Sequence, residues 1–190
     1  MTYAERSVDG FLSGVASAQV APSAGAVTAV TGAMAASLCE MVCLHTSESE
    51  RTERLADAQA AIRDRRDLLL ALADEDGAAV DEVQTAFEER RYDGHEQAAL
   101  RTATEIPLRI AEAAQVVAHR AVVVAEDGTA NAQADAVVGA MLARAAVTSA
   151  ASIVRANLDL LDDESFERNV RARTEAAETT ADEAVAAVRQ

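Results

Sequence analysis

The stretch AVTAVTGAMAASLCEMVCLH, Ala26–His45, decides the fold class. Its apolar residues occur on every side of a helix, so in a water-soluble protein this helix must be surrounded by other helices. Gly32 and Ala36 lie one turn apart within it and would allow a neighbouring helix to approach closely. The segment therefore predicts the central helix of an all-α bundle.

Helix-forming residues also fill the chain on both sides of this segment, and proline occurs only at positions 22 and 107. Further helices are predicted from a cap at Ser7 and over about 50–90, 97–125, 131–161 and 163–188. Ala21–Gly25 reads as a loop, and Pro107 should bend its helix because it removes a backbone hydrogen bond. We expect one domain over residues 1–190, a bundle of five to six helices.

The amino-acid composition limits the ways in which such a bundle can be stabilised. Aromatic residues make up 3% of the chain and Trp is absent, so Ala, Val and Leu must build the core. Each buried Ala removes little apolar area, and at about 25 cal/mol per Å² a single-chain core of this kind is modest. We therefore expect an Ala-rich core and a homodimer.

The charge balance excludes some classes of partner. There are 17 basic residues, all of them Arg, against 32 acidic residues, which gives a net charge of −15. Such a surface repels phosphate backbones and anionic lipid, so we expect no nucleic-acid and no membrane partner. Acid-rich, lysine-free composition is typical of cytoplasmic proteins of salt-loving organisms, and the charges of Glu5, Arg6 and Asp9 argue against a signal peptide. A cytoplasmic location is the expectation.

The cysteines and histidines do not predict a metal site. Cys39 and Cys43 lie four apart on one helix, where a disulfide rarely finds its geometry, and they read as small buried hydrophobes. His45, His95 and His119 fall in different segments without ligand spacing. The chain also has no Walker loop, Rossmann fingerprint or Gly-x-Ser-x-Gly elbow.

One carboxylate falls on an apolar stripe. The stripe of the long helix runs through Leu69 and Leu72 and continues through Val80 and Val83, and the position that joins its two halves is Asp76. A carboxylate on a core-facing stripe loses hydration and must be paired, protonated or usefully strained. The alternative is that the acidic cluster 74–77 breaks the helix, which would leave Asp76 in solvent.

Two further sets of charged residues are weaker candidates for a functional site. Asp135 lies at the start of the fifth predicted helix, where it could serve a site or simply stabilise the helix dipole. Arg109, Arg144 and Arg155 interrupt apolar helices and could receive an anionic group of a ligand, although each could equally face water.

Several short motifs occur together in a recognisable order. They are Ala21-Pro22-Ser23-Ala24-Gly25-Ala26-Val27, Asp74-Glu75-Asp76, Ile106-Pro107-Leu108-Arg109, Ala134-Asp135-Ala136-Val137-Val138 and Val154-Arg155-Ala156-Asn157-Leu158. In this order and spacing, from about Ser7 to the C-terminus, the chain resembles the cyclodeaminase/cyclohydrolase family. That family includes the cyclodeaminase domain of formiminotransferase-cyclodeaminase and stand-alone methenyltetrahydrofolate cyclohydrolases.

The resemblance implies an all-helical homodimeric enzyme acting on one-carbon units carried by tetrahydrofolate, with its active site near the dimer interface. It implies a catalytic role for Asp76, and substrate contacts for the following residues of the matching motifs: Pro22, Gly25, Asp135, Arg155 and Asn157. It implies no metal and no cofactor beyond the tetrahydrofolate substrate.

The loop departs from the family pattern. The family usually has Pro-Gly-Gly-Gly-Ser where this chain has Pro22-Ser23-Ala24-Gly25-Ala26. Three functions therefore stay open. The first is hydrolysis of 5,10-methenyltetrahydrofolate to 10-formyltetrahydrofolate, favoured because no transferase domain is attached. The second is deamination of formiminotetrahydrofolate with release of ammonia, and the third is a folate-binding or interaction dimer without turnover, which the altered loop favours.

Overall fold

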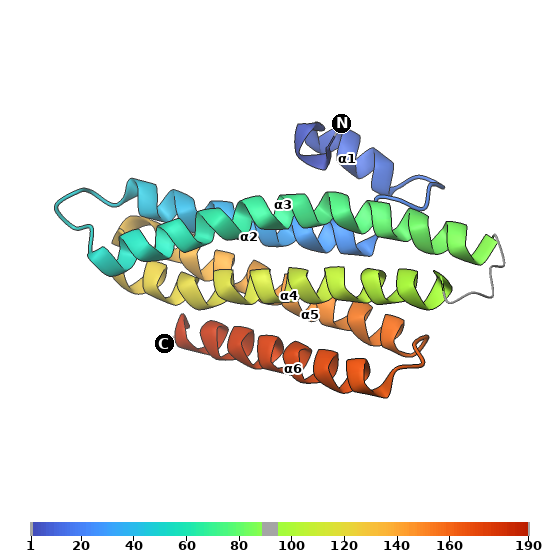
Figure 1. Cartoon of the computed structure of the whole chain (residues 1–190). Coiled ribbons are helices and arrows are strands. Elements are labelled where there is room, and N and C mark those ends of the chain that lie inside the picture. The colour runs from blue at the N-terminus through green and yellow to red at the C-terminus, as the bar shows by residue number, and fades with distance from the viewer. Residues whose placement is uncertain (1, 89–94, 190) are drawn as a thin grey trace.

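The computed structural model describes residues 2–88 and 95–189, and within them the chain forms helices and no strand. The helices are α1 (Val8–Val15), α2 (Ala24–His45), α3 (Glu53–Glu88), α4 (His95–Asp127), α5 (Gln133–Leu158) and α6 (Glu164–Ala187), with the 3₁₀ turns η1 (Tyr3–Glu5) and η2 (Ala130–Ala132). Figure 1 shows the five long helices, α2 to α6, lying side by side as a bundle. The all-α prediction is confirmed.

The helix α2 packs against α3, α4 and α5, so it has neighbours on several sides, but not on every side as its sequence predicts, because Met34 and Leu44 are exposed. The contact is close because glycines of α2 and α5 leave room for side chains of the neighbouring helix. A Cβ added at Gly32 would lie 3.1 Å from a methyl group of Leu69, and one added at Gly139 of α5 would overlap the Cys39 sulfur. The small residues of α2 therefore bring its neighbours close on several sides.

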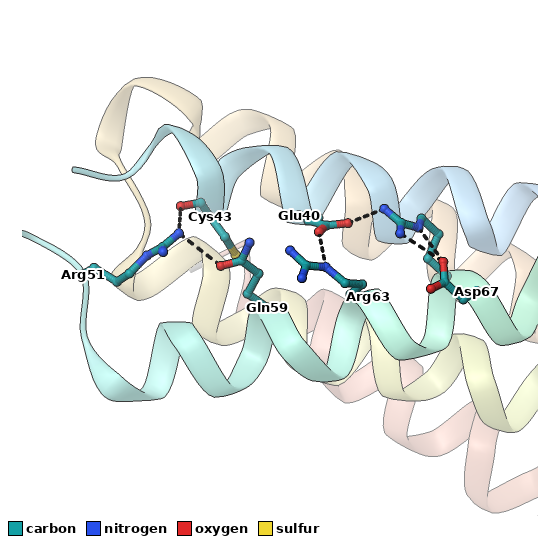
Figure 2. Close-up of polar contacts among 7 residues, drawn as sticks. Glu40, Cys43, Arg51, Gln59, Arg63 and Asp67 are labelled. Carbon is teal, nitrogen blue, oxygen red and sulfur yellow. Dashed lines mark hydrogen bonds and ion pairs between the residues drawn. The ribbon is translucent and has the colours of Figure 1, made fainter. Parts of the chain in front are cut away.

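The one carboxylate of α2 is buried and paired. Glu40 is 5% exposed, and its two oxygens accept hydrogen bonds from Arg63 Nε at 2.8 Å and Arg66 at 2.6 Å, both from α3 (Figure 2). A further arginine, Arg51, donates to the backbone carbonyl of Cys43 at the end of α2. A cation is favourable there because the C-terminal end of a helix carries a partial negative charge.

The N-terminal segment lies outside the bundle, across α3 (Figure 1). The backbone amide of Tyr3 donates to Asp74 Oδ1 at 2.8 Å, and the Tyr3 ring packs edge-on against Phe11 of α1. The Tyr3 hydroxyl would lie 2.7 Å from a Cβ at Gly77, so the absence of a side chain there makes room for the ring. As predicted, Ser7 caps α1, by accepting from the Gly10 amide.

Helix boundaries differ from the predicted ones by a few residues, for physical reasons. The helix α3 begins at Glu53 because the Thr52 hydroxyl accepts a hydrogen bond from the Leu55 amide, which makes Thr52 the cap. The start of α6 agrees with the prediction, because Asp163 is its N-cap and its side chain accepts from two backbone amides. Pro107 lies within α4, which continues as helix on both sides of it.

Two apolar segments have the length and composition of a membrane span, namely α2 and residues Ala130–Leu158. In α2, 56% of the most apolar stretch is buried inside the bundle, and in the second segment the share is 44%. The core helix of a water-soluble bundle has the same length and composition, so these segments are weak evidence for a membrane location.

Candidate active site

Asp76 lies on the buried face of α3, as its apolar stripe predicts. The helix runs without a break through residues 74–77, and Asp76 is 5% exposed. The alternative, in which the acidic cluster breaks the helix and leaves Asp76 in solvent, is therefore wrong. Its neighbours point elsewhere, because Asp74 accepts from the Tyr3 amide and Glu75 pairs with Arg109 of α4.

The Asp76 carboxylate caps the start of a different helix. Its Oδ2 accepts hydrogen bonds from the Ala26 backbone amide and from the Ser23 hydroxyl, each at 2.9 Å. Ser23 is the N-cap residue of α2, yet its side chain makes no bond to the amides of its own helix. A serine in this position normally accepts such a bond itself. Here the carboxylate from α3 takes that role, and the helix N-terminus offers it partial positive charge.

The two oxygens of this carboxylate have different surroundings. Oδ1 accepts no hydrogen bond from the part of the chain that the structure describes, whereas Oδ2 accepts two. Burial raises the pKa of the Asp76 carboxyl above its usual value, and the bonds from Ser23 and Ala26 oppose that rise. The site thus holds a carboxyl group with one oxygen held by two donors and one oxygen without a donor among the described residues.

Asp76 lies at the base of a pocket of about 240 Å³ at the end of the bundle where α2 begins and α5 ends. The lining residues are Ser23, Ala24, Gly25, Asp76, Ala79, Val80, Val83, Phe87, Leu100, Ala103, Ile153, Asn157 and Leu160. Asp76 is the one ionisable residue among them. Phe87 and Leu160 are 51% and 56% exposed at its rim. An apolar pocket with a single carboxylate suits a flat organic ligand that carries positive charge.

Asn157 contributes the second oriented polar group. Its amide nitrogen donates to the backbone carbonyl of Ala103 at 2.7 Å. That carbonyl is free because residue 107, four positions on, is proline and has no N–H to donate within α4. With the nitrogen engaged, Asn157 Oδ1 remains as an acceptor on the pocket wall. Pro107 therefore orients a pocket residue of another helix.

The remaining predicted site residues divide into two groups. Gly25 lines the pocket beside Asp76, and a Cβ there would overlap the Asp76 carboxylate. Pro22 is buried outside the lining, and its ring would lie 3.3 Å from a Cβ added at Gly14 of α1. Arg155 is turned to α6, where it forms a bidentate pair with Glu178. Asp135 lies in the first turn of α5, about 30 Å along the helix axis from Asn157 at ~1.5 Å per residue.

The structure therefore brings together Asp76, Gly25 and Asn157, and places Asp135 and Arg155 outside this pocket. The other two arginines considered from the sequence are also paired, Arg109 with Glu75 and Arg144 with Asp182. Among the described residues, no three His, Cys, Asp or Glu side chains gather as metal ligands.

Sequence reasoning did not single out Ser23 as a partner of Asp76, nor Phe87 and Leu160 as part of the pocket rim. The bond from Ser23 joins residues 53 positions apart, and no local pattern indicates it. Phe87 did carry a signal, because it extends the stripe through Val80 and Val83, but its exposure at the end of α3 is a tertiary feature.

Comparison with known proteins shows which family the chain resembles in sequence and in fold. Residues 7–176 match the formiminotransferase-cyclodeaminase family. A methenyltetrahydrofolate cyclohydrolase of Methylorubrum extorquens is 35% identical over 172 residues, which are 84% of this chain and 82% of the relative. The crystal structure of formiminotetrahydrofolate cyclodeaminase from Thermotoga maritima is similar with a TM-score of 0.92 and 28% identity, over 98% of this chain and 95% of that one.

Proposed function

Because the chain belongs to the formiminotransferase-cyclodeaminase family, we propose that it is a folate one-carbon enzyme that hydrolyses 5,10-methenyltetrahydrofolate to 10-formyltetrahydrofolate. The observation that carries the proposal is the buried carboxylate of Asp76, the one ionisable side chain among the described residues that line the pocket. The substrate's methenyl centre is a delocalised cation, and a carboxylate in a pocket of low polarity stabilises it more strongly than it would in water.

Asp76 Oδ1 supplies the proton transfers of this reaction. A water molecule attacks the methenyl carbon, a C–O bond forms, and Oδ1 accepts the proton that the water loses. The protonated carboxyl then returns a proton to the departing ring nitrogen as its C–N bond breaks. The hydroxyl proton of the adduct leaves as the formyl C=O forms, so each turnover consumes one water and releases one proton. Water and the folate suffice, without a metal or further cofactor.

Deamination of 5-formiminotetrahydrofolate is the alternative on the same site, and the likeness to the Thermotoga maritima enzyme favours it. The absorbance of the methenyl group distinguishes the two reactions. The purified protein in concentrated salt should consume the methenyl absorbance faster than the background hydrolysis. A deaminase would instead produce that absorbance from the formimino substrate and release ammonia. A protein that does neither is a folate-binding or interaction dimer, and the proposal fails.

The working unit that we infer is one helical domain over residues 1–190 with an Ala-rich core, paired with a second copy in the cytoplasm. An uncharged outer face of α2 supports the pairing. Its larger apolar residues that are not buried are Val27, Val30, Met34, Leu38, Met41 and Leu44, of which Met34 and Leu44 are 54% and 61% exposed, and Thr31 and Ser37 lie among them. On a protein with a net charge of −15, such a strip is the surface on which two copies repel each other least.

The adjoining helix α5 continues this face. Its Val138 is 46% exposed, and its arginines are turned away to α6, where Arg144 pairs with Asp182 and Arg155 with Glu178. The carboxylate of α2, Glu40, is turned inward to α3. Glu40 of α2 and the arginines of α5 are therefore directed away from the face that we assign to the second copy, and Asp135, three residues before Val138, is half-buried.

A charge placed in this face should separate the dimer. Met34→Asp would bury two carboxylates, one from each copy, against apolar surface, and we expect a particle of 19.9 kDa instead of twice that mass. Light scattering coupled to gel filtration measures this mass. Ala176→Asp, on the exposed side of α6, is the matched control and should stay dimeric. A wild-type protein of 19.9 kDa at all concentrations contradicts the assignment.

A further inference from the structure

We propose that the Ser23 hydroxyl is a positioning group for Asp76, and that it fixes which carboxylate oxygen exchanges the proton with the substrate. The assignment rests on the proposed function and adds a residue to it. Ser23 acts through Asp76, by donating to Oδ2 at 2.9 Å, and the oxygen it leaves free is Oδ1.

The proposal is supported by the position of two hydrogen-bond donors, the Ser23 hydroxyl and the Ala26 amide, at the same oxygen of Asp76. A carboxylate rotates easily about its last bond, since the rotation is broad and nearly two-fold. A single donor, the Ala26 amide, could hold either oxygen in turn. With Ser23 and Ala26 both bonded to Oδ2, a rotation breaks two charge-assisted hydrogen bonds at once. Oδ1 is thereby left as the oxygen that accepts no hydrogen bond from the described residues, beside Gly25 of the pocket lining.

Among the described residues, the Ser23 hydroxyl makes no hydrogen bond besides the one to Asp76. As the N-cap residue of α2 it makes no side-chain bond to its own helix, and the Ala26 amide is satisfied by Asp76 instead. The hydroxyl is half-buried and lines the pocket. Removing it therefore subtracts one hydrogen bond from the carboxylate and leaves every backbone partner of α2 in place.

The ionisable groups that the described residues place near Asp76 are held by partners that a change at Ser23 does not touch. They are Asp74 with the Tyr3 amide, Glu75 with Arg109 of α4, and Tyr3 against Phe11 and Arg6. On α5, Arg155 lies outside the pocket and pairs with Glu178. The first two turns of α2 contribute no ionisable side chain. A change in the titration of Asp76 in a Ser23 variant therefore reports the lost hydroxyl.

The test compares Ser23→Ala, Ser23→Gly and Ser23→Thr in the hydrolysis of 5,10-methenyltetrahydrofolate. We expect kcat to fall roughly tenfold in the first two, from the loss of a hydrogen bond to a charged group. The acid limb of kcat/KM should move to higher pH, because the lost donor favours the carboxylate and its removal raises the Asp76 pKa further. Ser23→Thr keeps a hydroxyl and should restore both properties.

Three results would overturn the proposal. One is a Ser23→Ala enzyme with the kcat and acid limb of the unaltered protein. Another is a loss of kcat with an unmoved acid limb and a lower Tm, which would make Ser23 a structural cap only. The third is a Ser23→Thr enzyme no better than Ser23→Ala. If the unaltered protein does not consume the chromophore at all, the proposed function itself is wrong, which is a separate and earlier failure.

Discussion

Asp76→Asn is expected to lower kcat/KM for methenyltetrahydrofolate by about 10³-fold, within the range that a positioned acid–base group contributes. An asparagine oxygen can still accept from Ser23 and the Ala26 amide, so the cap of α2 survives the change. What disappears is the negative charge opposite the methenyl cation and the atom that takes the proton. Loss of the methenyl absorbance under initial-rate conditions measures the effect.

The same variant should be at least as stable as the unaltered protein at neutral pH. Burial raises the pKa of Asp76 in the folded state, so the ionised form weakens the fold above the unfolded pKa, and the amide removes that penalty. The difference in Tm should vanish as the pH falls below the unfolded pKa, where both residues are neutral. Asp74→Asn, two positions away and bonded to the Tyr3 amide, is the control. Wild-type turnover by Asp76→Asn would refute the catalytic assignment.

Local periodicity is enough to predict the fold and the position of Asp76. The all-round apolar character of α2 predicts a helix with neighbours on several sides, and the phase of Leu72 and Val80 predicts that Asp76 faces inward. Both predictions need only a count of residues along one helix. They succeed because α3 is continuous through its acidic cluster.

The partners of Asp76 depend on contacts between helices and have no local signature. The loop was expected to last to Gly25, but α2 begins at Ala24, because a carboxylate from α3 satisfies the Ala26 amide. Pro107 was expected to bend its helix, yet its main consequence for the site is the free Ala103 carbonyl that orients Asn157. Each effect joins residues about 50 positions apart, so neither can be read from a single segment.

The loop before α2 shows the same difference between what a local sequence pattern predicts and what depends on contacts between helices. Relative to the family's usual glycines, this chain has Ser23 and Ala24. Ser23 bonds to Asp76, and Ala24 is an exposed residue of the pocket lining. Gly25 is the position where a side chain has no room, because a Cβ would overlap the Asp76 carboxylate. The loop therefore differs from the family pattern at residues 23 and 24, but the position beside the Asp76 carboxylate is still glycine.

Gly25→Ala should consequently be destabilising, against the usual effect of this change. Alanine in place of glycine inside a helix normally stabilises by roughly 0.5–1 kcal/mol. Here the new methyl group would push Asp76 from its position and break both hydrogen bonds to Oδ2, so we expect a net loss of about 1–3 kcal/mol in the free energy of unfolding. Turnover should fall about 10²-fold, because the reacting oxygen is displaced. Urea unfolding and initial rates measure the two effects, and Gly10→Ala, on the exposed face of α1, is the control.

A double-mutant cycle identifies the carboxylate as the cause. Asp76→Ala removes the group that the new methyl would overlap, so adding Gly25→Ala to that variant should cost nothing or stabilise it, by the ordinary preference of a helix for alanine. The two changes must then be strongly coupled, with the destabilisation by Gly25→Ala confined to proteins that retain Asp76. Equal destabilisation in both backgrounds would mean that the methyl group meets some other part of the fold. In that case the close contact between Gly25 and Asp76, on which the geometry of the pocket depends, would not exist in solution.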